Sequence, residues 1–168
     1  SNKKNKAIIN VAKYYFANNK AAYALKWFKK VNVDILSKED RKEINFKMGY
    51  AYLITENLLL AKKQFLPLIN DSRYGNDSRY YYGYIAYKLE DYGIAESTLK
   101  EIEDDDTYRL EISYYLLDIS FQSGKFERCI TVGEELIKTA KRKERSEISK
   151  IIGESFFNLK RYSEAIPY

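Results

Sequence analysis

Two residue types that enzymes often use for catalysis, histidine and cysteine, are absent or nearly absent from this sequence. The 168 residues contain no histidine, which removes the commonest general base and the commonest metal ligand. The single cysteine, Cys129, has no histidine to activate it as a nucleophile, so we expect a buried, inert thiol. No Walker loop, dinucleotide fingerprint or serine elbow is present. The sequence therefore predicts a protein that is not an enzyme, with no cofactor and no metal site.

Two charged segments could still bind ions. Residues 101–106, EIEDDD, lack the spaced ligands and the glycine of a calcium loop, so we interpret them as a turn that places acid before a helix. Residues 138–150, KTAKRKERSEISK, could contact nucleic acid or anionic lipid. Interleaved glutamates break this basic run, which favours a solvated connector and no nucleic-acid partner. Because no apolar run approaches 18 residues, we also expect no membrane insertion.

The most informative pattern is a spacing of 34 residues between small or apolar positions. Gly49, Gly83 and Leu117 follow one another at this distance, and each has a small residue twelve positions later. Ala12 and Gly153 hold the same position in two further copies, which small insertions offset from the 34-residue spacing. We call these five positions the anchors. A repeat of this length indicates stacked units that share one structure.

Each copy divides into two helical patterns that are separated by a short polar turn. The predicted turns are residues 17–20, 55–57, 89–91, 122–125 and 159–161. Ser37 and Asn76 stand where N-caps would begin the first helices of two copies. Small residues at the anchors allow the paired helices to approach closely. We therefore expect an almost wholly helical protein without a sheet.

This helix–turn–helix period resembles the tetratricopeptide repeat. The matching stretches are GYAY…LLLAKKQF at 49–65, GYIAYKLEDYGIAESTL at 83–99, SGKFERCITVG at 123–133 and GESFFNLKRYSEAIPY at 153–168. The resemblance implies an all-α fold, a right-handed α-solenoid of stacked helix pairs with about four and a half repeats. We place a single repeat domain over residues 1–168, with repeats at 5–36, 42–75, 76–109, 110–145 and, truncated, 146–168.

The last repeat ends partway through its second helix, so we expect the chain to be part of a longer array. Its C-terminal edge should then expose apolar surface around Phe156 and Leu159 and could self-associate there. The phrases YYYGYIAYKLEDY and IIGESFFNLKRYSEAIPY look similar to long repeat proteins of some Gram-negative cell envelopes. This similarity slightly favours the bacterial periplasm or cell envelope over the cytoplasm.

In this repeat family the first helix of each pair lines a concave face, at positions three before and one, four and five after the anchor. Transferred to this sequence, these positions form an aromatic stripe with few charges, while Tyr82 and Tyr92 are expected in the core. The predicted partner-binding residues are Phe16, Phe46, Tyr50, Tyr80, Tyr84, Tyr87, Tyr114, Asp118, Phe121 and Phe157. The family's clamp for carboxylate tails is absent, because the position after the anchor reads Lys13, Tyr50, Tyr84, Asp118 and Glu154.

These patterns predict a scaffold that binds a peptide or helix of an unidentified partner protein in an aromatic-lined concave groove. Aromatic residues supply a large contact area with little entropy to lose. Tyrosines in stacked helices also serve packing alone, so a purely structural spacer or accessory domain of a larger envelope protein is the alternative. Nucleic-acid binding is a weaker alternative.

Overall fold

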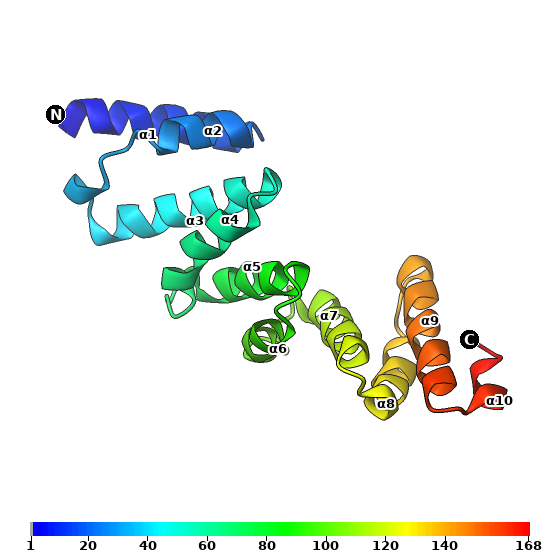
Figure 1. Cartoon of the computed structure of the whole chain (residues 1–168). Helices are drawn as coiled ribbons and strands as arrows, with labels where there is room; N and C mark the ends of the chain where they lie inside the picture. The colour runs from blue at the N-terminus through cyan, green and yellow to red at the C-terminus, as the bar shows by residue number, and fades with distance from the viewer. Residues whose placement is uncertain (1) are drawn as a thin grey trace. The chain divides into compact units, whose positions relative to one another are not determined.

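The computed structural model describes residues 2–168, and within them it contains α-helices, short 3-10 helices and no strand, as the sequence predicts (Figure 1). Helices pair along the chain. The pairs are α1 (Asn2–Ala17) with α2 (Ala21–Phe28), α3 (Lys38–Ile54) with α4 (Leu58–Phe65), α5 (Gly75–Lys88) with α6 (Tyr92–Lys100), α7 (Arg109–Gln122) with α8 (Phe126–Leu136), and α9 (Arg142–Asn158) with α10 (Tyr162–Ala165). Single-turn 3-10 helices η1 (Val33–Ile35) and η2 (Leu66–Leu68) lie between pairs.

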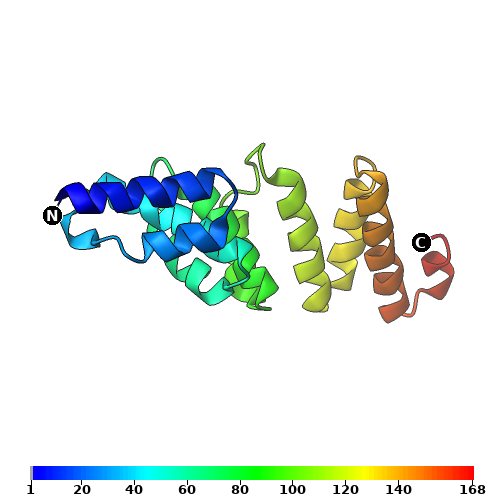
Figure 2. The same ribbon diagram turned by 90° about the horizontal axis from the view of Figure 1, so that it is seen from above.

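The chain forms two compact units, and the boundary between them lies at Thr98 and Leu99. In unit 1, which ends at Thr98, each helix from α1 to α5 packs against the next one along the chain. In unit 2, which covers Leu99–Tyr168, α8 packs between α7 and α9, and α10 follows against α9 (Figure 2). This sequential stacking of helix pairs is the tetratricopeptide-type α-solenoid.

The turns inside the five pairs share one backbone geometry. The seventh residue after each anchor has a positive φ, with values of 57° at Asn19, 59° at Glu56, 60° at Glu90, 70° at Gly124 and 61° at Lys160. The amide of the next residue donates to a carbonyl five residues back in every turn, for example Asn57 N to Tyr52 O at 2.8 Å. This pattern is the Schellman motif, which satisfies the last carbonyls of a helix and ends it.

The anchors lie where paired helices come closest. A Cβ built on Gly49 would stand 2.9 Å from the ring of Phe65, sixteen residues later. Around another anchor, the Cys129 thiol lies 3.8 Å from the Leu117 carbonyl and is fully buried. Burial raises the pKa of the Cys129 thiol, which agrees with the inert role expected from the sequence.

One predicted helix cap is confirmed and another is wrong. The Ser37 side chain accepts a hydrogen bond from Asp40 N at 3.1 Å and begins α3. Asn76 instead lies inside α5, which begins at Gly75. The preceding turn is closed by Asp71, whose carboxylate accepts the amides of Arg73 and Tyr74.

The C-terminal edge differs from its expected surface. Phe156 is only 4% exposed, because the ring of Tyr168 stacks on it at 5.8 Å and the guanidinium of Arg161 lies 4.7 Å from its centre. The expectation that Phe156 lacks a cover is therefore wrong. Leu159 is half-buried against the same core. The apolar residue most exposed at this edge is Ile166, at 83%.

Candidate interaction surface

The ten predicted binding residues all lie on the first helix of a pair. They are distributed over α1, α3, α5, α7 and α9. All but one are half-buried, and Phe157 is 63% exposed. A half-buried ring can pack against its own fold and still present one face to a partner.

Among the helices of residues 2–168, none is both long and apolar enough to cross a membrane.

Five of the predicted residues come together in unit 1. We call the set Phe16, Phe46, Tyr50, Tyr80, Tyr81 and Tyr84 the aromatic row. Ring centres are 5.9 Å apart between Phe16 and Tyr50, and 5.5 Å between Tyr50 and Tyr81. Tyr80 continues the row, 5.4 Å from Tyr81 and 6.4 Å from Tyr84. The row therefore joins α1, α3 and α5 through ring contacts.

Tyr81 is the centre of this row, and it is not among the residues predicted from the sequence. Its ring stacks at 5.2 Å on Phe65, which is fully buried, and lies 6.3 Å from Phe46. Tyr81 stands two residues before an anchor, a position that the family's groove set does not include. The equivalent residue one repeat earlier is Lys47, whose Nζ lies 5.0 Å from the ring centre of Phe16. No signal in the sequence marks this position, because it is tyrosine in one repeat and lysine in the repeat before.

The charges beside the row are largely paired with each other. Lys13 Nζ lies 2.8 Å from Glu43 Oε2, and Lys47 Nζ lies 3.6 Å from Glu43 Oε1. Burial alone would raise the pKa of Glu43, but the hydrogen bond and charge of Lys13, with the charge of Lys47, outweigh it and hold that pKa below its usual value. Lys13, which the sequence places in the groove, thus serves to join α1 to α3.

Three residues that stand four positions after an anchor, in the copies of Gly83, Leu117 and Gly153, make a different contact. The ring of each packs against the ring of the residue nine positions after the same anchor. That second residue lies at the start of the second helix, across the turn. Tyr87 lies 6.3 Å from Tyr92, and Phe157 lies 5.1 Å from Tyr162. Phe121 lies 5.6 Å from Phe126 in the same way. One face of each of these rings is therefore occupied within its own repeat.

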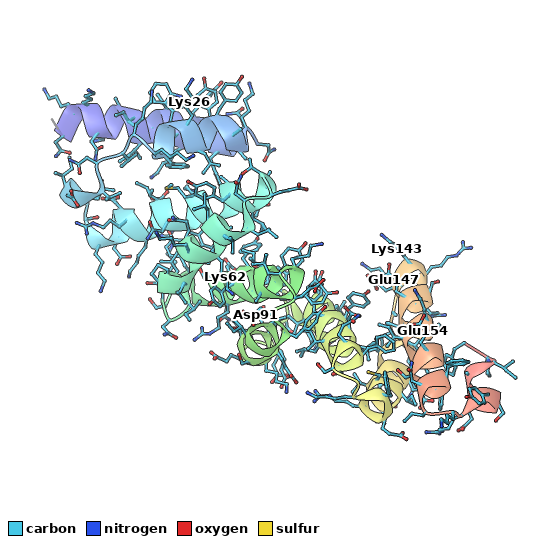
Figure 3. The ribbon with its side chains drawn as sticks, in the orientation of Figure 1. Lys26, Lys62, Asp91, Lys143, Glu147 and Glu154 are labelled. Atoms are coloured by element: carbon cyan, nitrogen blue, oxygen red, sulfur yellow. The ribbon has the colours of Figure 1, made fainter. Side chains whose placement is uncertain are left out.

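The two tyrosines expected in the core are only partly buried. Tyr92 is half-buried beside Tyr87, and Tyr82 is half-buried with Lys62 Nζ 5.2 Å from its ring centre. Lys62 also pairs with Asp91 at 3.3 Å, so α4 is joined to the turn before α6 (Figure 3). These contacts bind neighbouring repeats of unit 1 through mixed aromatic and charged packing.

Unit 2 has a cavity of about 140 Å³ beside the predicted residue Tyr114. Its walls come from α7, the end of α8, the segment after α8, and α9. Burial, the charges of Glu147 and Asp118, and a hydrogen bond with Glu147 together raise the pKa of Tyr114 to about 12. Asp118, also a predicted residue, accepts a hydrogen bond from Gln122 Nε2 at 3.2 Å. Within the described residues, no three Cys, Asp or Glu side chains converge as a metal site would require.

No protein-family model and no curated protein matches the sequence. Solved structures do match over nearly the whole chain. MamA AMB-1 aligns with a TM-score of 0.79 at 14% identity and covers 99% of this chain and 88% of its own. MamA MSR-1 aligns with a TM-score of 0.76 at 14% identity and covers 98% of this chain and 91% of its own. These likenesses establish the tetratricopeptide-type fold.

Proposed function

We propose that this chain is a protein-interaction scaffold that holds a peptide or helix of a partner protein against the aromatic row of unit 1. The observation that carries the proposal is the continuity of the row. Its six rings come from three successive first helices, contact one another, and all remain partly exposed. Continuous apolar surface of this kind marks interaction sites on soluble proteins.

The fold supports the same conclusion in a more general way. Helical repeats form extended surfaces in which neighbouring repeats contribute equivalent positions, and such surfaces suit extended or helical ligands. The bacterial cell envelope as the site of action is also our proposal, and the sequence resemblance alone supports it.

A structural spacer is the second candidate, and the position of Tyr81 favours it. Because Tyr81 stacks on the buried Phe65, part of the row also serves to hold α4 and α5 together. If the whole row has this role, truncating its outer rings will destabilise the fold and will not affect a binding partner specifically.

The experiment begins with peptides selected from a display library against the full chain. Affinities of the selected peptides are then measured by fluorescence anisotropy for Tyr50→Ala and Tyr84→Ala. Tyr14→Ala is the matched control, because Tyr14 lies on α1 outside the row and is 64% exposed. Loss of a binding hot spot of about 2 kcal/mol corresponds to roughly 30-fold weaker binding, while the control should stay within about twofold.

Urea unfolding of the same variants separates the two candidates. Variants that stay folded and lose the peptide support the scaffold. Variants of the row that unfold, with the control intact, support the spacer. Selected peptides that bind every folded variant equally would show that the row is not the site.

We also propose that a second copy of the chain can associate through the C-terminal edge of unit 2. Phe157, Tyr162 and Ile166 are exposed there at 63%, 53% and 83%. Light scattering of the full chain at increasing concentration should show self-association, which a Phe157→Ser and Ile166→Ser double variant should reduce. A strict monomer throughout would overturn this part of the proposal.

A further inference from the structure

In unit 1, a lysine of one repeat forms an ion pair with a glutamate of the next repeat. Lys13 is the residue directly after an anchor, and Glu43 stands six residues before the following anchor, Gly49. Their side chains meet at 2.8 Å between α1 and α3. The pairing shows that these two repeat positions, on consecutive first helices, can come within ion-pair distance.

In unit 2 the same two positions both carry acids. Glu147 stands six residues before the anchor Gly153, and the residue directly after the preceding anchor is Asp118. After burial, the charges of both carboxylates contribute to the raised pKa of the Tyr114 hydroxyl. Unit 2 thus keeps the acid of the unit 1 pair and replaces its cation with a second acid.

The cavity of about 140 Å³ in unit 2 is lined by Glu147 and Tyr114, whereas Asp118 is not among its lining residues. This volume is about ten times the smallest cavity that can hold a single water molecule. Leu136 and the buried Ile148 form apolar wall, and the rings of Tyr114 and Tyr115 form aromatic wall. A cavity of this composition suits an organic group with an apolar stem better than it suits a bare ion.

Three glutamates line the same cavity with exposed side chains: Glu111 on α7, and Glu144 and Glu147 on α9. Glu144 accepts a hydrogen bond from the backbone amide of Lys141 at 3.1 Å. The ion pairs found among the described residues do not include Glu111 or Glu147. Figure 3 shows Glu147 one turn along α9 from Lys143. Lys141 also lines the cavity, with an exposed side chain, so the lining carries three carboxylates against one cation. The cavity therefore combines aromatic and apolar walls with an excess of negative charge.

We propose that this cavity binds an arginine side chain of a partner peptide. A guanidinium is planar, stacks on tyrosine rings and offers five donors to carboxylates on two sides. Its aliphatic stem would contact Leu136 and Ile148, as long basic side chains commonly do on apolar surface. The inference rests on the proposed function in that a peptide supplies the cation, but it concerns a surface separate from the aromatic row.

The test titrates the full chain with a capped pentapeptide that has one central arginine between glycines, followed by nitrogen-15 NMR. Matched peptides carry citrulline, which keeps the shape without the charge, or lysine in the same place. Saturable shifts should appear around Glu111, Tyr114 and Glu147 with the arginine peptide. The citrulline peptide should bind at least about tenfold more weakly, since a hydrogen bond to a charged group contributes roughly 1.5–3 kcal/mol.

Variants locate the effect in the cavity. Glu147→Gln and Glu111→Gln should each weaken binding of the arginine peptide about tenfold. Glu103→Gln makes the same charge change in the exposed turn before α7 and should leave binding within about twofold. Asp118→Lys restores the cation that unit 1 has at this position, so it should pair with Glu147 as Lys13 pairs with Glu43 and should weaken binding. Circular dichroism confirms that each variant is folded.

Equal binding of the arginine and citrulline peptides would overturn the proposal, as would equal losses in Glu103→Gln and Glu147→Gln. Tighter binding of lysine than of arginine would contradict the stacking geometry. If calcium chloride shifts the NMR signals of the same residues and displaces the peptide, the carboxylates bind a divalent cation and the proposal is overturned. If peptides selected on the aromatic row still bind while arginine does not, the cavity proposal fails and the scaffold proposal stands.

Discussion

Unit 1 and unit 2 are built from the same kind of helix pair, but the side chains that connect neighbouring pairs differ between them. In unit 1 the rings of three first helices touch in a row, and Lys13 joins Glu43 across α1 and α3. The ring pairs seen within unit 2 each join residues of a single helix pair, such as Phe121 with Phe126. With 17 Lys and Arg against 10 Asp and Glu, unit 1 has a formal charge of +7, whereas unit 2, with 12 against 14, has −2.

The repeat determines the backbone in both units, whereas a few side chains decide what each surface can do. The position after the anchor is lysine or tyrosine in unit 1 and acidic in unit 2. Lys13 forms an ion pair with Glu43 in unit 1. In unit 2 the equivalent residue is Asp118, and a nearby cavity is lined by three glutamates and one lysine. One scaffold thus offers an aromatic surface in one unit and an anionic one in the other.

Removing the ring beneath the aromatic row should have the largest effect on the fold. Phe65 is fully buried and carries Tyr81 and Phe46 on its ring, so Phe65→Ala should lower the free energy of unfolding by about 3–5 kcal/mol. Phe157→Ala in unit 2 is the control for an exposed ring, and its loss should cost less than about 1 kcal/mol. Urea denaturation of both variants gives the difference. Similar losses would mean that the units do not differ in this way.

Overpacking an anchor should have the next largest effect. In Gly49→Ala the new methyl would stand 2.9–3.0 Å from three atoms of the Phe65 ring, which is fully buried and cannot move away freely. Such overpacking costs about 1–3 kcal/mol, which exceeds the gain of about 1 kcal/mol from replacing a helical glycine. Gly93→Ala, where no atom lies within 4 Å, should instead stabilise unit 1. Thermal unfolding should shift in opposite directions for the two variants. A stabilised Gly49→Ala would contradict the close approach of α3 and α4.

Lowering the pH should destabilise unit 1 by protonating Asp71, with a smaller effect than either of the two substitutions above. The hydrogen bond from Lys42 at 2.7 Å, with the amides of Arg73 and Tyr74, lowers the pKa of Asp71 to about 2. Because the folded pKa lies below the unfolded value, this stabilisation is present above about pH 4 and is lost as the pH falls towards 2. Asp71→Asn should therefore melt lower at neutral pH and respond less to acid over that range. Asp104→Asn, at an exposed site in unit 2, should follow the wild type.

The smallest expected effect is the alkaline titration of Tyr114 in unit 2. Its pKa of about 12 means that the stabilisation from its neutral form is complete below about pH 10 and is lost as the pH rises through 12. The difference in tyrosinate absorbance between the wild type and Tyr114→Phe isolates this group. In Glu147→Gln the pKa of Tyr114 should fall only part of the way, because burial is the largest cause. An unchanged pKa would place Glu147 away from the hydroxyl.

The sequence was sufficient for the fold because the repeat depends on local spacing. Gly49 and Phe65 are sixteen residues apart, and the helix–turn–helix geometry alone brings them together. The five turns were predicted for the same reason. The predicted cap at Asn76 was wrong because Asp71, several residues earlier, already accepts the amides that close the turn before α5.

The surface was less predictable because it depends on contacts between elements. Family spacing placed Phe16, Tyr50 and Tyr84 correctly on first helices, but the role of Tyr81 depends on the ring of Phe65 from a second helix. Phe156 was expected to be exposed, and its cover comes from Tyr168 after a reversal of the chain that periodicity does not encode. The cavity beside Tyr114 likewise requires the spatial approach of α7 and α9.

The shared turn geometry has a consequence for the order in which the protein folds. Each of the five turns closes with hydrogen bonds between residues only a few positions apart, and Asn19, Glu56, Glu90, Gly124 and Lys160 adopt the same left-handed conformation. Such short loops cost little closure entropy, so a helix pair can form before any distant segment has been found. Folding can therefore start at any turn and spread to the neighbouring pair, and unfolding can remove one pair at a time from an end.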